Sequence, residues 1–221
     1  VAQNLLTDPG LGGARDGGFV KLGTNTLSLT GAGNTFNGPV DVRNGLLRAR
    51  LGGTNDLNVA ATNAFFDALG ERATVGDLTG IGTLTNGVIA VTGTLDAGTN
   101  SAPAGAKLTV ENLGLAPGST FVCEWSTNAL GRITNDFVAV TGSLAAEGPG
   151  FVDFGRSEAA PIMLPFKTTI MSYGTFTGSF AGWKALNTGL PPSTGKALLI
   201  TAEAGLVKLE VRSGGTLFMV R

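Results

Sequence analysis

The 221-residue sequence has no histidine and a single cysteine, Cys123. Without histidine the chain cannot form a Ser-His-Asp triad, a Cys-His pair or a histidine-based zinc or iron site. One cysteine forms no intrachain disulfide and no cysteine-ligated metal site. The Asp-x-Asp-x-Asp-Gly pattern of calcium loops is also missing. These absences lead us to predict no catalytic residue, no cofactor and no metal site.

Charge is scarce as well, with 14% charged residues and a formal net charge of −1. The Lys and Arg residues are scattered, so the sequence shows neither the basic footprint of a nucleic-acid-binding protein nor a membrane-surface patch. No apolar run approaches the ~20 residues that span a membrane. The segment Gly189–Lys196 departs from a phosphate-binding loop, because it has one residue too many between its glycines and Ala197 where Ser or Thr is required.

The chain is instead rich in glycine, with 35 residues, and in hydrophobic residues, which make up 43%. This composition supports a sizeable core with many tight corners. The clearest example is residues 17–50, in which Leu27 and Leu29 alternate with polar neighbours and each short strand stops at a Gly or Asn-Gly corner. Frequent corners without helices between them are typical of a chain that coils into stacked layers, a β-solenoid.

This stretch also resembles the autotransporter-associated β-strand repeat, also called the passenger-associated transport repeat. The matching residues are Gly18, Val20, Lys21, Gly23, Thr26, Leu27, Leu29, Thr30, Gly31, Asn34, Thr35, Phe36, Gly38, Val40, Val42, Gly45 and Leu46. The usual Gly-Gly-Thr after the aromatic residue is replaced by Asn37-Gly38-Pro39, and full matches cover about one sixth of the chain. The resemblance implies a bacterial, exported β-helix at the cell surface or outside the cell, and it implies no single activity.

We therefore predict an all-β parallel β-helix with a short helical excursion and a terminal cap. Residues 1–16 are expected as an N-terminal arm or cap, 17–150 as the solenoid, and 151–221 as further solenoid layers or a β-rich cap. A helix is expected at Asn63–Gly70, which has Ala and Leu at helical spacing. The alternative is a short solenoid followed by an antiparallel β-sandwich over 116–221.

Three short phrases suggest degenerate repeats. Ala90–Leu95 and Ala139–Leu144 are near copies, and Gly174–Phe180 repeats their strand-corner-strand form. A solenoid layer commonly takes about 20–29 residues, so the offset between the first two phrases predicts that they lie two layers apart. Later strands are expected at Ile162–Leu164, Thr168–Tyr173, Ala197–Thr201 and Leu206–Val211, and a terminal strand at 216–221 could pair with another molecule.

The residues with the most chemical potential are carboxylates and aromatic rings. The candidate carboxylates share no motif, and they are Asp41, Asp96, Glu111, Glu124 and Asp153. Glu124 alternates with Cys123 and Trp125, so we expect it to face solvent, whereas Cys123 is expected as a small buried filler beside Phe121. Arg43, Arg48 and Arg50 are expected on the solvated face of the sheet. Trp125, Tyr173 and Trp183 could stack on sugar rings, but core packing is favoured for each Trp, and Phe19, Phe36 and Phe121 are expected to fill the interior.

These observations favour an exported structural protein without catalysis, which forms a stalk or a filament by association of its solenoid ends. One alternative is an adhesin that binds glycans or a host surface, and a second is a polysaccharide-active β-helix enzyme. The first residue is Val1 and no signal-peptide pattern is visible, so we expect that any signal peptide has been removed or lies outside this sequence. We therefore expect a mature extracellular or surface protein, or an excised passenger, with copies of itself as its main partner and with no nucleic acid and no membrane span.

Overall fold

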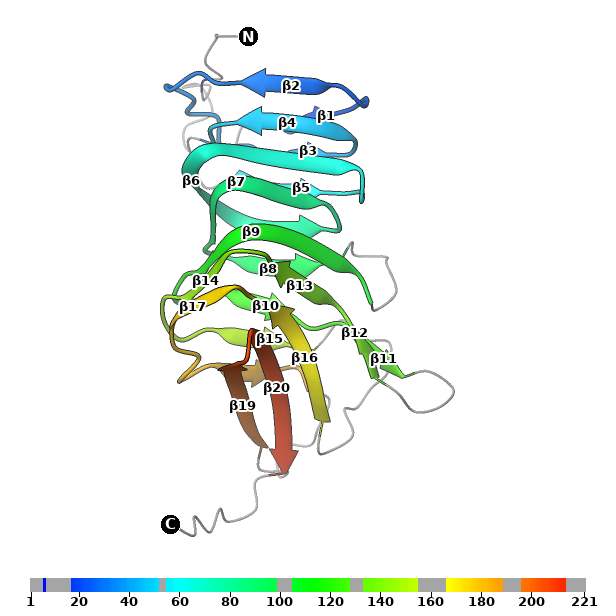
Figure 1. Ribbon diagram of the computed structural model, residues 1–221, viewed down its shortest axis with the longest axis vertical. Coiled ribbons are helices and arrows are strands. Elements are labelled where there is room, and N and C mark those ends of the chain that lie inside the picture. Colours follow the sequence, from blue (N-terminus) through cyan, green and yellow to red (C-terminus); the bar gives the residue numbers. More distant parts are fainter. Residues whose placement is uncertain are drawn as a thin grey trace.

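The computed structural model describes residues 6, 17–51, 55–98, 105–127, 133–154, 166–188 and 196–213. These residues form an all-β structure, and no helix in them is long and apolar enough to cross a membrane. The strands lie one above another along the long axis of the molecule, with the N-terminal strands at one end and β19–β20 at the other (Figure 1). Eighteen strands belong to one mixed sheet, and β11 and β12 form a separate pair.

Most of the sheet consists of three columns of parallel strands, which we call A, B and C. Column A contains β1 (Phe19–Lys21), β3 (Val40–Val42), β5 (Asn55–Val59), the last part of β6 (Ala64–Gly80), β8 (Thr94–Ala97), β10 (Thr120–Val122), β15 (Phe151–Asp153) and β18 (Lys184–Leu186). Column B contains β2 (Thr26–Leu29), β4 (Gly45–Ala49), the first parts of β6, β7 (Thr83–Val91) and β9 (Lys107–Leu115), then β13 (Phe137–Val140) and β16 (Phe166–Ser172). Column C contains the middle part of β6 and the later parts of β7 and β9, then β14 (Ser143–Ala146) and β17 (Thr175–Gly178).

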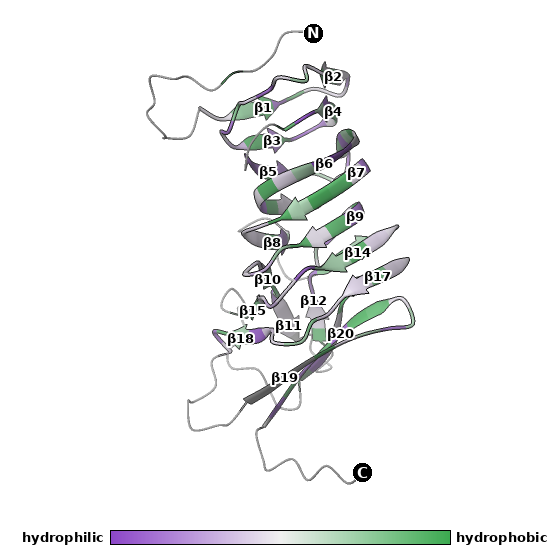
Figure 2. Ribbon diagram, turned by 90° about the vertical axis from the view of Figure 1, so that its left-hand side faces the viewer, coloured by the Kyte–Doolittle hydropathy of each residue, from purple (hydrophilic) through white to green (hydrophobic). Residues whose placement is uncertain are grey.

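The core is continuous through all three columns because inward residues are stacked in register. In column A the aligned inward positions are Phe19, Val40, Leu57, Leu78, Leu95, Phe121, Val152 and Ala185. Those from Val40 to Val152 are buried, and Phe19 and Ala185 pack against the core at its two ends. Hydrophobic and hydrophilic positions alternate along the strands, as period-two patterning requires (Figure 2).

Two residues of the repeat-like stretch satisfy backbone groups at its corners. Lys21 is buried, and its Nζ donates to the carbonyl oxygens of Leu22, Gly23 and Asn44 at 2.7–3.1 Å. Asn34 is also buried, and its Nδ2 donates to Arg50 O at 2.9 Å. The motif residues there thus hold successive layers together, since buried carbonyls need donors.

The helix expected at Asn63–Gly70 is wrong, because this segment begins β6. Ala64, Phe66 and Ala68 are buried while Phe65 is exposed, so the period is two rather than 3.6. Leu69 and Gly70 have φ of 60° and 79°, which turns the strand from column B into column C without ending it.

The near-copy phrases lie two layers apart, as their offset predicts, because β9 pairs with β7 on one side and with β13 and β14 on the other. They do not occupy the same place in a layer. Ala90–Leu95 leads from column C to column A, whereas Ala139–Leu144 leads from column B to column C. The two phrases have the same corner geometry, but they turn between different pairs of columns. At each corner a glycine amide donates to the carbonyl of the layer before, Gly93 to Gly76 and Gly142 to Glu111, both at 2.7 Å. A Cβ at either glycine would lie within 2.9 Å of that carbonyl oxygen, so the close approach requires glycine.

The antiparallel sandwich over 116–221 does not describe these strands, because β10, β13, β14, β15, β17 and β18 all pair in parallel. Among the described strands, antiparallel partners are β11 (Trp125–Thr127) with β12 (Ile133–Asn135), and β20 (Leu206–Ser213) with β16 and with β19 (Lys196–Glu203). An isolated antiparallel bridge also joins Gly80 and Gly98. The strands expected at 197–201 and 206–211 fall within β19 and β20, and the one expected at 168–173 falls within β16 except for Tyr173. The structure does not describe the strands expected at 162–164 and 216–221. It also does not describe the arm expected at 1–16, apart from Leu6.

Candidate metal centre

Three of the candidate carboxylates lie apart on the outer faces of different strands. Asp41 accepts hydrogen bonds from Arg43 Nε at 2.6 Å and Asn58 Nδ2 at 3.0 Å. Glu111 accepts from the backbone amide of Asn86, and Asp153 accepts from Asn187 Nδ2. These contacts tie neighbouring layers together and bring no pair of carboxylates into an open cleft.

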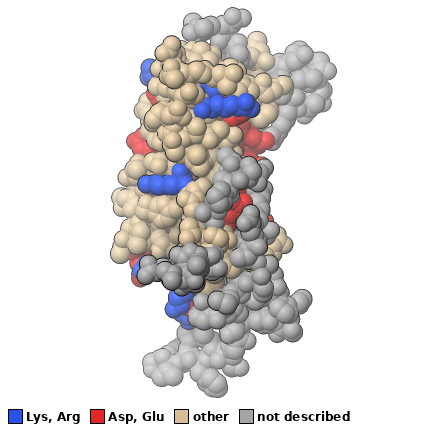
Figure 3. All heavy atoms as spheres, turned by 90° about the vertical axis from the view of Figure 1, so that its right-hand side faces the viewer, with Lys and Arg blue, Asp and Glu red and all other residues tan. Residues whose placement is uncertain are grey.

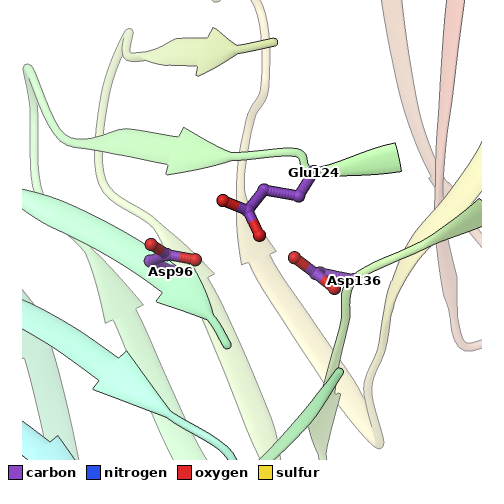
Figure 4. A group of neighbouring side chains, drawn as sticks. All are labelled: Asp96, Glu124 and Asp136. Atoms are coloured by element: carbon purple, nitrogen blue, oxygen red, sulfur yellow. The ribbon is translucent and has the colours of Figure 1, made fainter. Parts of the chain in front are cut away.

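Asp96 and Glu124, by contrast, come together with a third carboxylate, Asp136. Asp96 lies in β8, Glu124 lies between β10 and β11, and Asp136 lies between β12 and β13. One oxygen from each carboxylate lies within 4.8 Å of the others, and all three residues are buried. Figure 4 shows the three side chains pointing toward one another from these separate segments.

The expectation that Glu124 faces solvent is therefore wrong, since it is only 7% exposed. Alternation does place Glu124 opposite Cys123 and Trp125, which are in the hydrophobic core. However, Asp136 packs against Glu124 on that outer side, and the Asp136 amide donates to the Glu124 carbonyl at 3.0 Å. Alternation predicts the side of a strand from which a residue projects, and a later segment of the chain decides whether that side is covered.

Asp136 was not among the sequence candidates, because it lies far along the chain from Asp96 and carries no motif. Its Oδ1 accepts hydrogen bonds from the amides of Gly105 and Ala106, both at 2.8 Å. Its Oδ2 is buried, and no described residue donates a hydrogen bond to it. The only local signal is its place directly before an apolar strand, Phe137–Val140, which also suits an ordinary turn residue.

The electrostatics of the cluster follow from burial and like charges. Burial raises the pKa of Asp136 above its ordinary value, and the nearby Asp96 raises it further. The amides of Ala106 and Gly105 and the contact with the Glu124 carboxyl act to lower this pKa, but they do not outweigh burial. Burial, together with Asp136 and Glu124, also raises the pKa of the Cys123 thiol. Cys123 is thus a buried protonated thiol, as its interpretation as a core filler predicted, and it is not a thiolate nucleophile or ligand.

The cluster does not resemble the carboxylate pair of a glycosidase. Such enzymes place two carboxyls about 5–9.5 Å apart on either side of a bound sugar. Here the oxygens are within 4.8 Å of one another and the residues are buried, so no sugar ring fits between them. Oxygen atoms in this number and spacing suit a hard cation or shared protons.

The aromatic candidates mostly pack in the core, as expected for the two tryptophans. Trp125 is 4% exposed and meets Phe166 edge to face with ring centroids 5.2 Å apart. Trp183 is 7% exposed, and its Nε1 donates to Gly148 O at 2.9 Å. Tyr173 is half-buried and packs against Phe176. Phe121 is buried, and Phe19 and Phe36 pack against the core from partly buried positions.

The charged surface is dispersed. On the face in Figure 3, small groups of basic and acidic side chains are separated from one another by uncharged residues. The arginines predicted on the solvated face form ion pairs there: Arg43 with Asp41, Arg48 with Asp67, and Arg50 with Glu71. Residues 189–195 of the compared phosphate-loop segment lie outside the described residues.

Comparison with known proteins adds no assignment, because no protein-family model matches the chain and no curated protein matches it.

Proposed function

We propose that this chain is a non-catalytic structural module of an exported bacterial surface or extracellular protein, built as a parallel β-helix. The observation that carries the proposal is column A, in which parallel pairing runs from β1 to β18 above a continuous apolar core. Such a coil is long and needs no reactive pocket to act as a stalk. The repeat-like stretch at 17–50 supports the bacterial and exported setting by resemblance.

In this proposal the antiparallel strands act as a partial cap. Strand β20 pairs with β16 at the end of column B, and β19 pairs with β20. Parallel stacking along column B therefore stops at β16. Columns A and C stop at β18 and β17, each of which has a single described partner strand.

The module also associates with copies of itself through its ends. The Phe19 amide donates to Pro39 O, and the Lys21 carbonyl accepts from the Arg43 amide, so both residues direct their polar groups toward β3. The backbone amide and carbonyl groups of successive residues point to opposite sides of a strand. The amide and carbonyl of Val20 therefore point away from β3. Among the described residues no strand pairs with this edge of β1. Such an edge pairs with another strand, and unlike ends that meet head to tail give a filament.

A matched pair of variants tests this role of the edge. Val20→Pro removes the outward amide while the amides that bond to β3 remain, and Val20→Thr changes the side chain but keeps the amide. We expect sedimentation velocity to show assemblies that grow with concentration for the parent chain and the Thr variant, and a loss of assemblies for the Pro variant. Negative-stain images of the parent should show rods. A parent chain that stays monomeric at every concentration contradicts self-association, and compact particles contradict the stalk.

One observation favours the adhesin alternative. A shallow groove beside β17 and β19 is lined by three aromatic residues, Phe176, Phe180 and Trp183, with Ile200 and Ala202 on its far side. Aromatic rings at a groove can stack on sugars, and Phe176 is the most exposed of the three. Glycan-array binding that is lost in Phe176→Ala and kept in Val20→Thr would favour this alternative over the purely structural role.

A further inference from the structure

We propose that Asp96, Glu124 and Asp136 form a binding site for a divalent cation that prefers oxygen ligands, and that Ca²⁺ is the cation that fits best. The proposal is separate from the role of the module as a stalk, because it concerns what holds one layer of the molecule together. It replaces the expectation, drawn from missing motifs, that the chain has no metal site.

The first argument is the unsatisfied oxygen of Asp136. This residue is fully buried, and its Oδ1 already has two amide donors, whereas no described residue donates to its Oδ2. Figure 4 shows the carboxylate of Asp136 directed at Glu124 and Asp96. A buried carboxylate oxygen without a donor is costly, and such atoms in proteins are normally bonded to a donor, a water or an ion.

The second argument is that the carboxylates of Asp96, Glu124 and Asp136 converge in one place. Their oxygens lie within 4.8 Å of one another, and they come from three segments that are distant in sequence. Like charges at this distance repel, so the arrangement is favourable only when something positive or a proton lies between them. A divalent cation supplies both the charge and the electron-pair acceptor that Oδ2 lacks.

The third argument concerns which cation suits the site. The ligand set is made of oxygen atoms, because all three converging side chains are carboxylates and the chain has no histidine. Oxygen ligands favour Ca²⁺, Mg²⁺ or Mn²⁺ over Zn²⁺ and Cu²⁺. Ca²⁺ binds oxygens at about 2.3–2.6 Å and accepts irregular geometry, so opposite ligands lie up to about 5 Å apart, whereas Mg²⁺ requires a tighter octahedron. Three carboxylates that come from separate segments suit the flexible coordination of Ca²⁺ better than the strict octahedron of Mg²⁺.

A cation at this place would join the coil to the β11–β12 pair. Asp96 belongs to β8 in column A, while Glu124 directly precedes β11 and Asp136 directly follows β12. The bound ion would thus fasten both ends of this pair onto the outer side of column A. Ca²⁺ is then expected to raise the thermal stability of the whole chain, because only the folded state brings the three ligands together.

The site can be tested on the intact chain with two readouts. Terbium serves as a luminescent substitute for calcium, and the indole of Trp125, next to Glu124 in sequence, is close enough to sensitise it. We expect sensitised terbium emission that Ca²⁺ displaces, and a midpoint of thermal unfolding that rises by about 5–10 °C when Ca²⁺ is 100-fold above its Kd.

Matched variants locate the site. Asp136→Asn keeps the Oδ1 acceptor for Gly105 and Ala106 but removes the charge, and Glu124→Gln is equally conservative; each should weaken Ca²⁺ binding by about 100-fold or more. Glu71→Gln removes a surface carboxylate that pairs with Arg50, and it should bind Ca²⁺ as the parent does.

Some results would overturn the proposal even if a variant failed to fold. A parent chain that shows no binding and no thermal shift with Ca²⁺, Mg²⁺ or Mn²⁺ rules out the site and leaves a cluster neutralised by protons. If Glu71→Gln weakens Ca²⁺ binding as much as Asp136→Asn does, the ion is attracted by the negative charge of the surface in general and not by this site. Tighter binding of Mg²⁺ than of Ca²⁺ contradicts the choice of Ca²⁺.

Discussion

Two buried aspartates, Asp67 in the N-terminal part of the coil and Asp136 beside the β11–β12 pair, have opposite surroundings. Asp67 accepts hydrogen bonds from Arg48 Nε at 2.9 Å, Asn86 Nδ2 at 2.8 Å and the Leu69 amide at 2.7 Å. Burial acts to raise the pKa of Asp67, but these donors outweigh it and lower the pKa. The pKa of Asp136 is instead raised by burial and by Asp96.

The comparison shows that burial alone does not decide whether a carboxylate stabilises this fold. In the N-terminal layers each strand is followed closely by the next, so a carboxylate on the outer side finds an arginine or an amide one layer away. Seventeen residues separate the aligned Val40 and Leu57, whereas 33 separate Val152 and Ala185. The longer connections between layers cover outward-facing side chains. They bring Asp136 close to other acidic groups, and no described Lys or Arg forms an ion pair with it.

The largest effect is expected where a glycine is stacked directly against the layer before it. Gly80 has a φ of 120°, and a Cβ there would lie 2.2 Å from Val59 O in the preceding layer. Gly118, in the region of longer excursions, has a φ of 83°, but a Cβ there meets nothing within 4 Å. Gly80→Ala should cost more than about 4 kcal/mol or prevent folding. Gly118→Ala should cost only about 1–2 kcal/mol.

Urea denaturation of the two glycine variants measures this difference. Equal losses of stability in both variants would show that close contact with the preceding layer does not decide the cost of a side chain at a glycine position.

A smaller effect concerns the pH dependence of stability that Asp67 provides. Its pKa in the folded chain lies below the ordinary 3.8, so its contribution is present above that value and is lost as the pH falls through the folded pKa. Asp67→Asn should lower the free energy of unfolding by about 1–2 kcal/mol at pH 7, and the gap to the parent should close in strong acid. Urea denaturation from pH 7 to pH 3 checks this, and a gap that widens toward low pH would reverse the assigned sign.

The smallest effect is expected at Cys123, beside the acidic cluster. The thiol is fully buried with a raised pKa, so a thiol-specific reagent should label it only when the chain unfolds. Its labelling rate should match the rate of unfolding measured by fluorescence. Faster labelling of the native chain would mean that the region around Glu124 opens locally, and that it is less rigid than the N-terminal layers.

The strands and corners were predictable where the local pattern is enough to specify them. Thr26–Leu29 and Val40–Val42 form strands as the alternation predicts, and the corner phrases at Gly93 and Gly142 share one geometry. The helix at Asn63–Gly70 was predicted wrongly, because Ala64, Phe66 and Ala68 fit both periods and pairing with β4 selects the strand.

The acidic cluster was not predictable from the sequence. Patterning placed Glu124 on the side opposite Cys123, but it could not show that Asp136 would cover that side. The lengths of the excursions vary along the chain, so the register of the layers, and with it the meeting of Asp96 with Glu124 and Asp136, depends on contacts between distant segments. No local motif records such contacts.

The claim that neighbours, and not burial, determine the contribution of a buried carboxylate is tested most directly by one paired measurement. The free energy of unfolding is compared for Asp67→Asn, Asp136→Asn and the parent chain at pH 7 with a chelator present. We predict that Asp67→Asn is less stable than the parent, and that Asp136→Asn is at least as stable, because it removes a charge from an uncompensated cluster while keeping its amide hydrogen bonds. Equal destabilisation by both substitutions would contradict the account.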